Sequence, residues 1–276
     1  MRETLGDPDD GRVEFRTDES GGVTVVVDGH PQSYVDPHDP GLLTFEYVQH
    51  LATCLDALDP PAPQRLTITH LGGAAMTLAR YVEHTRPGSP QLVLEPDARL
   101  TERVRAHLPL PRGHRIRVRP TDGRAGMAAL ATHSADVIVL DAFDRGTVPP
   151  DLTTIEALAE CARVLRPRGV WLANLADEPT RRYVARVGAT ARAAGLRHQL
   201  LGGTHDVLKG RRFGNTVLCA SAQTLPADEI ARRLARSPFP SGVLGAQRLS
   251  RDARPFTDAD RAASPTPPDP GRWRVR

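Results

Sequence analysis

The spacing of apolar residues divides the chain at about residue 64. Before this point, two short apolar runs, 12–16 and 23–28, flank a Gly-containing turn and predict a β-hairpin. Residues 42–58 place their apolar side chains on one helical face and predict an amphipathic helix. Residues 59–63 (Asp-Pro-Pro-Ala-Pro) form a linker, because consecutive prolines cannot continue a helix. The sequence therefore predicts a small N-terminal unit over residues 1–60.

After the linker, strand-like runs alternate with helical periodicities. This alternation predicts an α/β domain over residues 64–236, with a mostly parallel sheet that is covered by helices on both faces. Seven strands are expected, at 65–71, 91–95, 115–119, 135–141, 169–175, 197–201 and 214–221. Helices are expected at 75–86, 97–107, 123–132, 152–165, 179–194 and 226–236.

The end of the chain has a different composition. Residues 246–276 are rich in Pro and Arg and nearly lack aliphatic side chains. Such a segment cannot bury enough apolar surface to fold alone. We expect residues 237–276 to form an extended tail, either disordered or wrapped over the body.

The amino-acid composition indicates the cellular compartment in which the protein is expected. Of the 276 residues, 39% are hydrophobic and 25% charged, which is typical of a globular chain. No apolar run reaches the ~18 residues of a membrane span, and the first residues lack a signal-peptide core. The cysteines, Cys54, Cys161 and Cys219, are far apart, which fits a reducing compartment. We expect a cytoplasmic protein that binds no membrane.

The distribution of charged residues along the chain indicates whether a nucleic acid is an expected partner. There are 36 basic and 33 acidic residues, and every basic residue except Lys209 is an arginine. The arginines are spread along the chain, whereas a nucleic-acid-binding protein usually concentrates its basic residues in a stripe. We therefore expect no nucleic-acid partner. The run 209–215 either binds an anion near the site or forms a solvated turn.

Glycines and carboxylates follow four consecutive predicted strands, where open α/β sheets bind their ligands. Gly72 and Gly73, after the first strand, allow either the close approach of a ligand or only a tight turn. Glu95, after the second strand, either accepts hydrogen bonds from both ribose hydroxyls or caps the next helix.

The third and fourth strands continue this order. Asp122, with Gly123 beside it, can accept a hydrogen bond from an adenine amino group, cap the following helix, or do both. Asp141 ends the fourth strand, and Asp144 follows three residues later. Together the four strand ends predict an adenosine-binding site, and no set of side chains has the spacing of a metal site.

Over residues 12–221 the chain resembles the spermidine synthase (polyamine aminopropyltransferase) family, in a divergent actinobacterial branch. Residues 28–32 (Asp-Gly-His-Pro-Gln) match the family's D-G-x-x-Q in the hairpin, and residues 44–47 (Thr-Phe-Glu-Tyr) match its E-F-x-Y segment. Residues 141–144 (Asp-Ala-Phe-Asp) match its D-x-x-D gatekeeping loop. The resemblance implies a Rossmann-like, class I methyltransferase fold and a homodimer.

The resemblance also implies ligands and residue roles. It implies S-adenosylmethionine or decarboxylated S-adenosylmethionine as co-substrate, and a small-molecule amine as acceptor. The nucleoside would be held by Gln32, Glu95 and Asp122, and the amine pocket would be lined by Tyr47, Asp141 and Asp144.

Two departures from the family pattern concern charge. Ala74 stands where the family has an acidic residue that contacts the propylamine nitrogen of the decarboxylated donor. Val48 and Gln49 stand where the family usually has His or Gln and then Glu. A cationic substrate loses counter-charges at both places.

The chemistry requires alignment of an amine with a sulfonium carbon and removal of an ammonium proton. Asp141 or Asp144 is the candidate base, although Asp144 can instead cap a loop turn. The leading hypothesis is transfer of an aminopropyl or related alkyl group. The alternatives are a small-molecule methyltransferase and a non-catalytic nucleoside-binding protein of the same fold.

Overall fold

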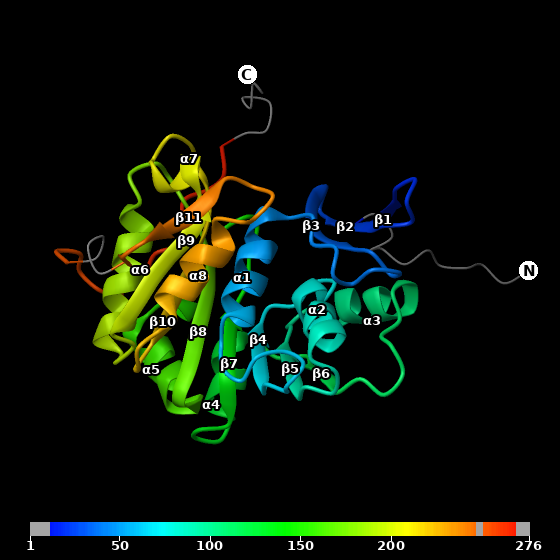
Figure 1. Ribbon diagram of the computed structural model, residues 1–276, viewed down its shortest axis with the longest axis horizontal. Helices are drawn as coiled ribbons and strands as arrows, with labels where there is room; N and C mark the ends of the chain where they lie inside the picture. The colour runs from blue at the N-terminus through cyan, green and yellow to red at the C-terminus, as the bar shows by residue number, and fades with distance from the viewer. Residues whose placement is uncertain (1–11, 247–250, 269–276) are drawn as a thin grey trace, which may run out of the picture.

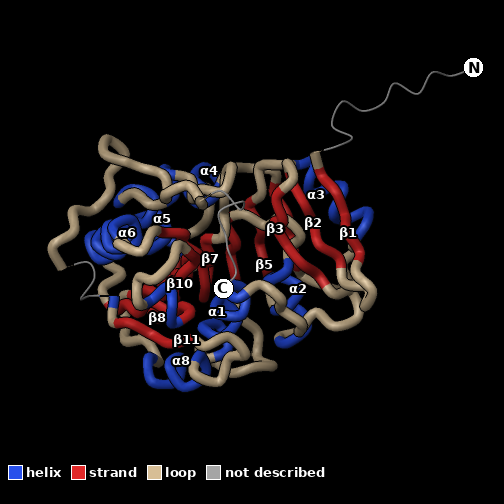
Figure 2. Tube along the Cα trace, turned by 90° about the horizontal axis from the view of Figure 1, so that it is seen from above, coloured by secondary structure: helices blue, strands red, loops and turns tan. Residues whose placement is uncertain are grey.

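The computed structural model describes residues 12–246 and 251–268. Its N-terminal part is a three-stranded antiparallel sheet, shown at the right of Figure 2. The strands are β1 (Val13–Thr17), β2 (Val23–Val27) and β3 (His30–Val35). A register shift between Val25 and Val26 places both of these side chains in the interior. The expected hairpin is present, and β3 extends it.

The large sheet has the order β11-β9-β10-β8-β7-β4-β5-β6 (Figure 1). Its strands are β4 (Ile68–Leu71), β5 (Gln91–Leu94), β6 (Ile116–Arg119), β7 (Ala135–Leu140), β8 (Leu165–Asp177), β9 (His198–Thr204), β10 (Gly214–Ser221) and β11 (Ser241–Leu244). The strands β4 to β8 pair in parallel, whereas β10 pairs antiparallel with β8 and β9. The expected mostly parallel α/β fold is confirmed.

The number of strands differs from the expectation. Within residues 12–246 and 251–268 the large sheet has eight strands rather than seven, because Ser241–Leu244 pairs antiparallel with β9. The prediction assigned these residues to the tail, since four residues with a glycine and no apolar alternation give no strand signal. The division of the chain into domains at 1–60, 64–236 and 237–276 stays a prediction. In the structure, β11 lies beyond residue 236 and still belongs to the large sheet.

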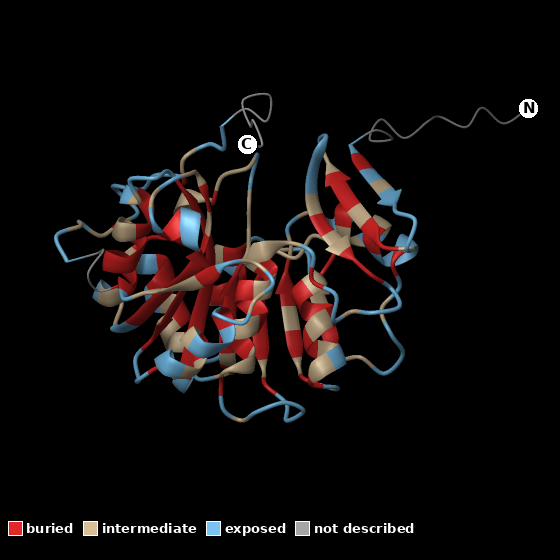
Figure 3. Ribbon diagram, turned by 45° about the horizontal axis from the view of Figure 1, so that its top comes forward, coloured by how far each residue is buried: buried red, intermediate tan, exposed pale blue. Residues whose placement is uncertain are grey.

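Helices cover both faces of the large sheet. They are α1 (Glu46–Asp56), α2 (Thr77–Thr85), α3 (Ala98–His107), α4 (Gly123–Ala128), α5 (Ile155–Val164), α6 (Arg182–Ala193), α7 (His205–Leu208) and α8 (Ala227–Leu234), with a 3₁₀ turn at Pro150–Leu152. Ile138 and Leu140 of β7 pack with α5 and α6, whereas Val137 and Val139 pack with α1 and α8. Figure 3 shows the resulting buried layer.

Part of the C-terminal segment, 251–268, packs against the body. Phe256 is only 2% exposed, and its ring lies 5.6 Å from that of Tyr183. The guanidinium of Arg186 lies 3.9 Å from the centre of the Phe256 ring. Of the two alternatives for the tail, wrapping over the body holds for this segment; residues 247–250 and 269–276 lie outside the described residues.

The same segment reaches the loop after β7. Asp258 forms a 2.6 Å ion pair with Arg124 of α4. Further along, the Ser264 hydroxyl accepts a 2.9 Å hydrogen bond from the buried backbone N–H of Val148. The segment thus ties the end of the chain to the loop that begins at Asp141.

Candidate active site

The glycine turn after β4 lies directly against the loop after β7. Gly72 has a φ of +85°, and a Cβ added to it would overlap the Asp141 carbonyl oxygen and lie 2.8 Å from the Ala142 Cα. A Cβ on Gly73 would overlap the side chain of Val93. Both glycines are therefore required by the packing of the chain itself. Their role toward a ligand stays a prediction.

The side chain of Glu95 stabilises this turn by hydrogen bonds. Its Oε2 accepts hydrogen bonds from the backbone N–H groups of Gly73 and Ala74, at 3.0 and 3.3 Å. Its Oε1 accepts one from Asp97 N–H at 3.0 Å. The residue is half-buried. Each carboxylate oxygen can accept two bonds, so Oε1 retains capacity for a hydroxyl donor.

Asp122 is the N-cap of α4. Its Oδ1 accepts a 2.8 Å hydrogen bond from Ala125 N–H, and the residue is exposed. The expected cap is present, and the second oxygen is available for another donor. Gly123 is buried at the first position of the helix, facing the side chain of Leu152.

Gln32 lies on β3, and this strand contacts the glycine turn. The hydroxyl of the neighbouring Ser33 accepts a 3.3 Å hydrogen bond from Ala75 N–H. The Tyr34 carbonyl accepts one from the Thr77 hydroxyl at 3.0 Å. The fold therefore places the D-G-x-x-Q segment beside the turn, as the nucleoside-binding prediction requires.

Asp141 is part of a chain of side-chain hydrogen bonds across three strands. Its Oδ1 accepts a 2.9 Å bond from the Asn174 amide, and the Asn174 carbonyl oxygen accepts a 2.8 Å bond from the Asn215 amide. Asn174 is fully buried. Burial raises the pKa of Asp141 to about 6, while the bond from Asn174 opposes this shift.

Tyr47, near the start of α1, lies on the same side of the sheet ends as Asp141. Its pKa is raised well above 10 by burial, and the negative charge of Asp141 raises it further. Tyr47 thus stays protonated at neutral pH and can only donate or accept a hydrogen bond. The structure brings together these two residues, which the sequence places 94 positions apart.

Asp144 is in a different environment. Its backbone N–H and C=O pair with Thr147 at 2.8 and 3.0 Å, around a tight turn with positive φ at Arg145 and Gly146. The residue is exposed, and its carboxylate has no partner among the described residues. The structure shows the turn, whereas the role of Asp144 as a base stays a prediction.

Sequence reasoning missed Asn174 and Asn215. Each is a single amide in an otherwise apolar run, VWLANL in β8 and GNTVLCAS in β10. A lone amide at the end of a buried strand was the available signal, because buried polar groups need partners.

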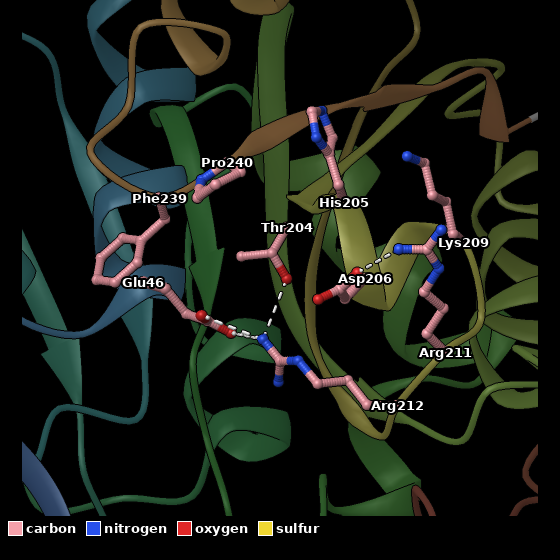
Figure 4. A pocket seen from close by; sticks show the side chains of 9 residues that line it. All are labelled: Glu46, Thr204, His205, Asp206, Lys209, Arg211, Arg212, Phe239 and Pro240. Atoms are coloured by element: carbon pink, nitrogen blue, oxygen red, sulfur yellow. Dashed lines mark hydrogen bonds and ion pairs between the residues drawn. The ribbon is translucent and has the colours of Figure 1, made fainter. Parts of the chain in front are cut away.

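A cavity of about 350 Å³ opens beside α7, at the ends of β9 and β10. We call it the α7 pocket (Figure 4). It is lined by Glu46, Thr204, His205, Asp206, Lys209, Arg211, Arg212, Phe239 and Pro240. Part of the run 209–215 therefore lines a cavity.

Two kinds of feature are absent from residues 12–246 and 251–268. No group of three or more His, Cys, Asp or Glu side chains there is arranged to hold a metal ion. None of the helices in these ranges has the length and apolar character needed to cross a bilayer.

Known proteins with a similar sequence or fold indicate the family of this chain. No family model matches the chain. It is similar to a probable spermidine synthase from Corynebacterium glutamicum ATCC 13032, with 30% identity and a TM-score of 0.82, covering 89% of this chain and 92% of that one. It is 27% identical over 206 residues to the polyamine aminopropyltransferase of Vibrio vulnificus, and 28% identical over 144 residues to that of Chromobacterium violaceum. These two matches span 64% and 53% of the length of the curated relatives.

The strand order and the helices on both faces of the sheet define a protein with a class I methyltransferase-like fold. Human methyltransferase-like protein 13 shares this fold, with 20% identity and a TM-score of 0.54. Within that class, the chain belongs to the spermidine synthase (polyamine aminopropyltransferase) family, as the similarity to the Corynebacterium protein over most of both chains shows.

Proposed function

We propose that this protein uses S-adenosylmethionine or its decarboxylated form as co-substrate and transfers an aminopropyl or related alkyl group to a small amine. One observation carries the proposal. The half-buried carboxylate of Asp141 is held by Asn174 near Tyr47, while the Asp141 backbone abuts Gly72 of the glycine turn. An acceptor-binding group and a donor-binding turn are thus adjacent.

The nucleoside side would use groups that retain hydrogen-bonding capacity. Glu95 would accept from the ribose hydroxyls through Oε1, and Asp122 would accept from an adenine amino group through its second oxygen. Gln32, on the strand beside the turn, would complete this side. Gly72, Gly73 and Gly123 would keep the backbone close to the ligand.

The acceptor side would align the amine and remove its proton. As the nitrogen bonds to the sulfonium carbon, the carbon–sulfur bond breaks and a neutral thioether leaves, so no acid is needed. The ammonium proton must pass to a base first. A carboxyl group with a pKa of about 6 is mostly ionised at neutral pH and is a stronger base than an ordinary Asp. This favours Asp141, with Tyr47 positioning the amine, while Asp144 remains the second candidate.

The experiment is a product analysis. The protein is incubated with each donor and a panel of amines, and the nucleoside product is identified by chromatography and mass spectrometry. Methylthioadenosine is expected from the decarboxylated donor, and its formation should be much slower with Asp141→Asn. If neither donor yields methylthioadenosine with any amine, aminopropyl transfer is rejected.

Ala74 favours a second candidate function. It offers no carboxylate to the propylamine nitrogen of the decarboxylated donor, and Glu95 binds only its backbone N–H. A methyltransferase needs no such carboxylate, and S-adenosylhomocysteine as the product would establish it. Tight nucleoside binding without turnover would indicate a binding protein. Homodimerisation, a cytoplasmic location and the lack of a nucleic-acid partner stay predictions.

A further inference from the structure

The α7 pocket adjoins the acceptor side of the proposed active site. Glu46, in its wall, directly precedes Tyr47 at the start of α1. Arg212, which also lines the pocket and pairs with Glu46, is three residues before Asn215, which is hydrogen bonded through Asn174 to Asp141. Two separate connections thus join the pocket to the proposed amine position.

The charges of the pocket do not cancel. Arg212 pairs with Glu46 at 3.2 Å, and Arg211 pairs with Asp206 at 3.0 Å, as Figure 4 shows. Lys209 also lines the pocket and has no ion-pair partner within the described part of the chain. Its Lys and Arg side chains outnumber its Asp and Glu side chains by one.

Arg212 is held in place but keeps donors. One terminal nitrogen donates to Glu46 and to the Thr204 hydroxyl, and the other donates to the Phe213 carbonyl at 3.3 Å. A guanidinium has five N–H groups, so two remain for another acceptor. A fixed guanidinium with free N–H groups suits a carboxylate, and the Lys209 ammonium in the same lining adds a positive charge.

We propose that the α7 pocket binds a carboxylate of the acceptor, so that the acceptor is an amino acid-like compound with both an amine and a carboxylate, rather than a simple diamine. This rests on the proposed function, which places the reacting amine beside Asp141. A second ammonium would be repelled by Lys209, whereas a carboxylate would be attracted. A cavity of about 350 Å³ has room for such a small ligand.

The test uses two probes that differ by one carboxylate. They are 1,4-diaminobutane and 2,5-diaminopentanoate (ornithine), each titrated by calorimetry into the full chain with methylthioadenosine present. Wild-type protein should bind ornithine more tightly. Lys209→Gln should weaken ornithine binding by about threefold to fivefold, as for one exposed ion pair, and should not weaken diaminobutane binding. Lys209→Glu should reverse the preference.

Two variants serve as controls. Arg168→Gln removes one positive charge from a side chain that is 84% exposed near the start of β8, away from the pocket, and should leave both affinities unchanged. Lys209→Arg keeps the charge and should keep the preference. The proposal is overturned if wild-type protein prefers diaminobutane or binds neither probe, or if Lys209→Gln and Arg168→Gln behave alike.

Product analysis separates this inference from the proposed function. Ornithine binding that depends on Lys209, without methylthioadenosine formation from the decarboxylated donor, supports the pocket and rejects aminopropyl transfer. Turnover of diaminobutane without ornithine binding supports aminopropyl transfer and rejects the pocket. If Lys209→Gln weakens S-adenosylmethionine binding instead, the carboxylate belongs to the donor, and the acceptor assignment is rejected.

Discussion

The two halves of the candidate site are built from different interactions. In the nucleoside half, Glu95 and Asp122 accept hydrogen bonds from backbone N–H groups, those of Gly73, Ala74 and Asp97 for Glu95 and that of Ala125 for Asp122, and neither residue is fully buried. In the acceptor half, Asp141 is hydrogen bonded to the side chain of Asn174, 33 residues away, and Tyr47 lies nearby in a desolvated position.

The two environments suit two different tasks, ligand binding in one half and proton transfer in the other. A carboxylate near the surface that already accepts backbone N–H bonds suits a group whose task is to accept further hydrogen bonds from a ligand. A carboxylate that is desolvated has a raised pKa, which suits a group that gains and loses a proton. We therefore expect the nucleoside half to hold a ligand, and the acceptor half to gain and lose a proton.

The largest expected effect is that of Asp141→Asn, which tests whether ligand binding and proton transfer are carried by different halves of the site. Asp141→Asn keeps the side-chain size and an acceptor for Asn174 but cannot take a proton, so kcat should fall by ~10²–10⁴. Methylthioadenosine binding should stay unchanged, because the nucleoside half is intact. With wild-type protein, kcat/KM should fall as the pH drops through about 6, where Asp141 becomes protonated. Steady-state kinetics and calorimetry measure these effects. If Asp144→Asn causes the larger loss, Asp144 is the base.

The same substitution should increase stability at neutral pH. The carboxyl group of Asp141 has a pKa of about 6 in the folded chain, against 3.8 for an ordinary Asp. Between these values the folded state binds a proton that the unfolded state has lost, so this group lowers stability as the pH rises from 4 to 7. Asp141→Asn should remove that loss, which is up to about 3 kcal/mol at pH 7. Urea denaturation at pH 4 and pH 7 measures it, and a variant less stable than wild type at pH 7 would contradict the raised pKa.

Local signals allowed the nucleoside half to be predicted from the sequence. Gly72 and Glu95 directly follow apolar runs, and Asp122 comes three residues after a predicted strand, so the ends of parallel strands could be aligned without knowing any distant contact. The Asn215–Asn174–Asp141 chain could not be predicted this way, because it depends on β10 inserting between β8 and β9. The same holds for β11 and for Phe256, whose places are set by tertiary packing.

A smaller effect is expected in the nucleoside half. Glu95→Gln keeps one oxygen acceptor but loses the charge that strengthens its hydrogen bonds, so methylthioadenosine affinity should fall by ~1–3 kcal/mol. Because Glu95 also braces Gly73 and Ala74, the midpoint of unfolding should fall as well. The exposed Glu102 of α3 provides a matched control, and Glu102→Gln should change neither value. Calorimetry showing equal nucleoside affinity for both variants would rule out ribose binding by Glu95.

The smallest expected effect concerns the C-terminal segment, which reaches the acceptor half through Ser264. Ser264→Ala leaves the buried Val148 N–H without its acceptor, so stability should fall by about 1 kcal/mol. Since Val148 belongs to the loop that begins at Asp141, kcat/KM for the amine should fall several-fold, with methylthioadenosine binding unchanged. Thr266→Ala, at an exposed position two residues later, should leave stability and kinetics at wild-type values. If Ser264→Ala weakens nucleoside binding as much as it slows turnover, the segment acts on both halves, and the two halves are not independent.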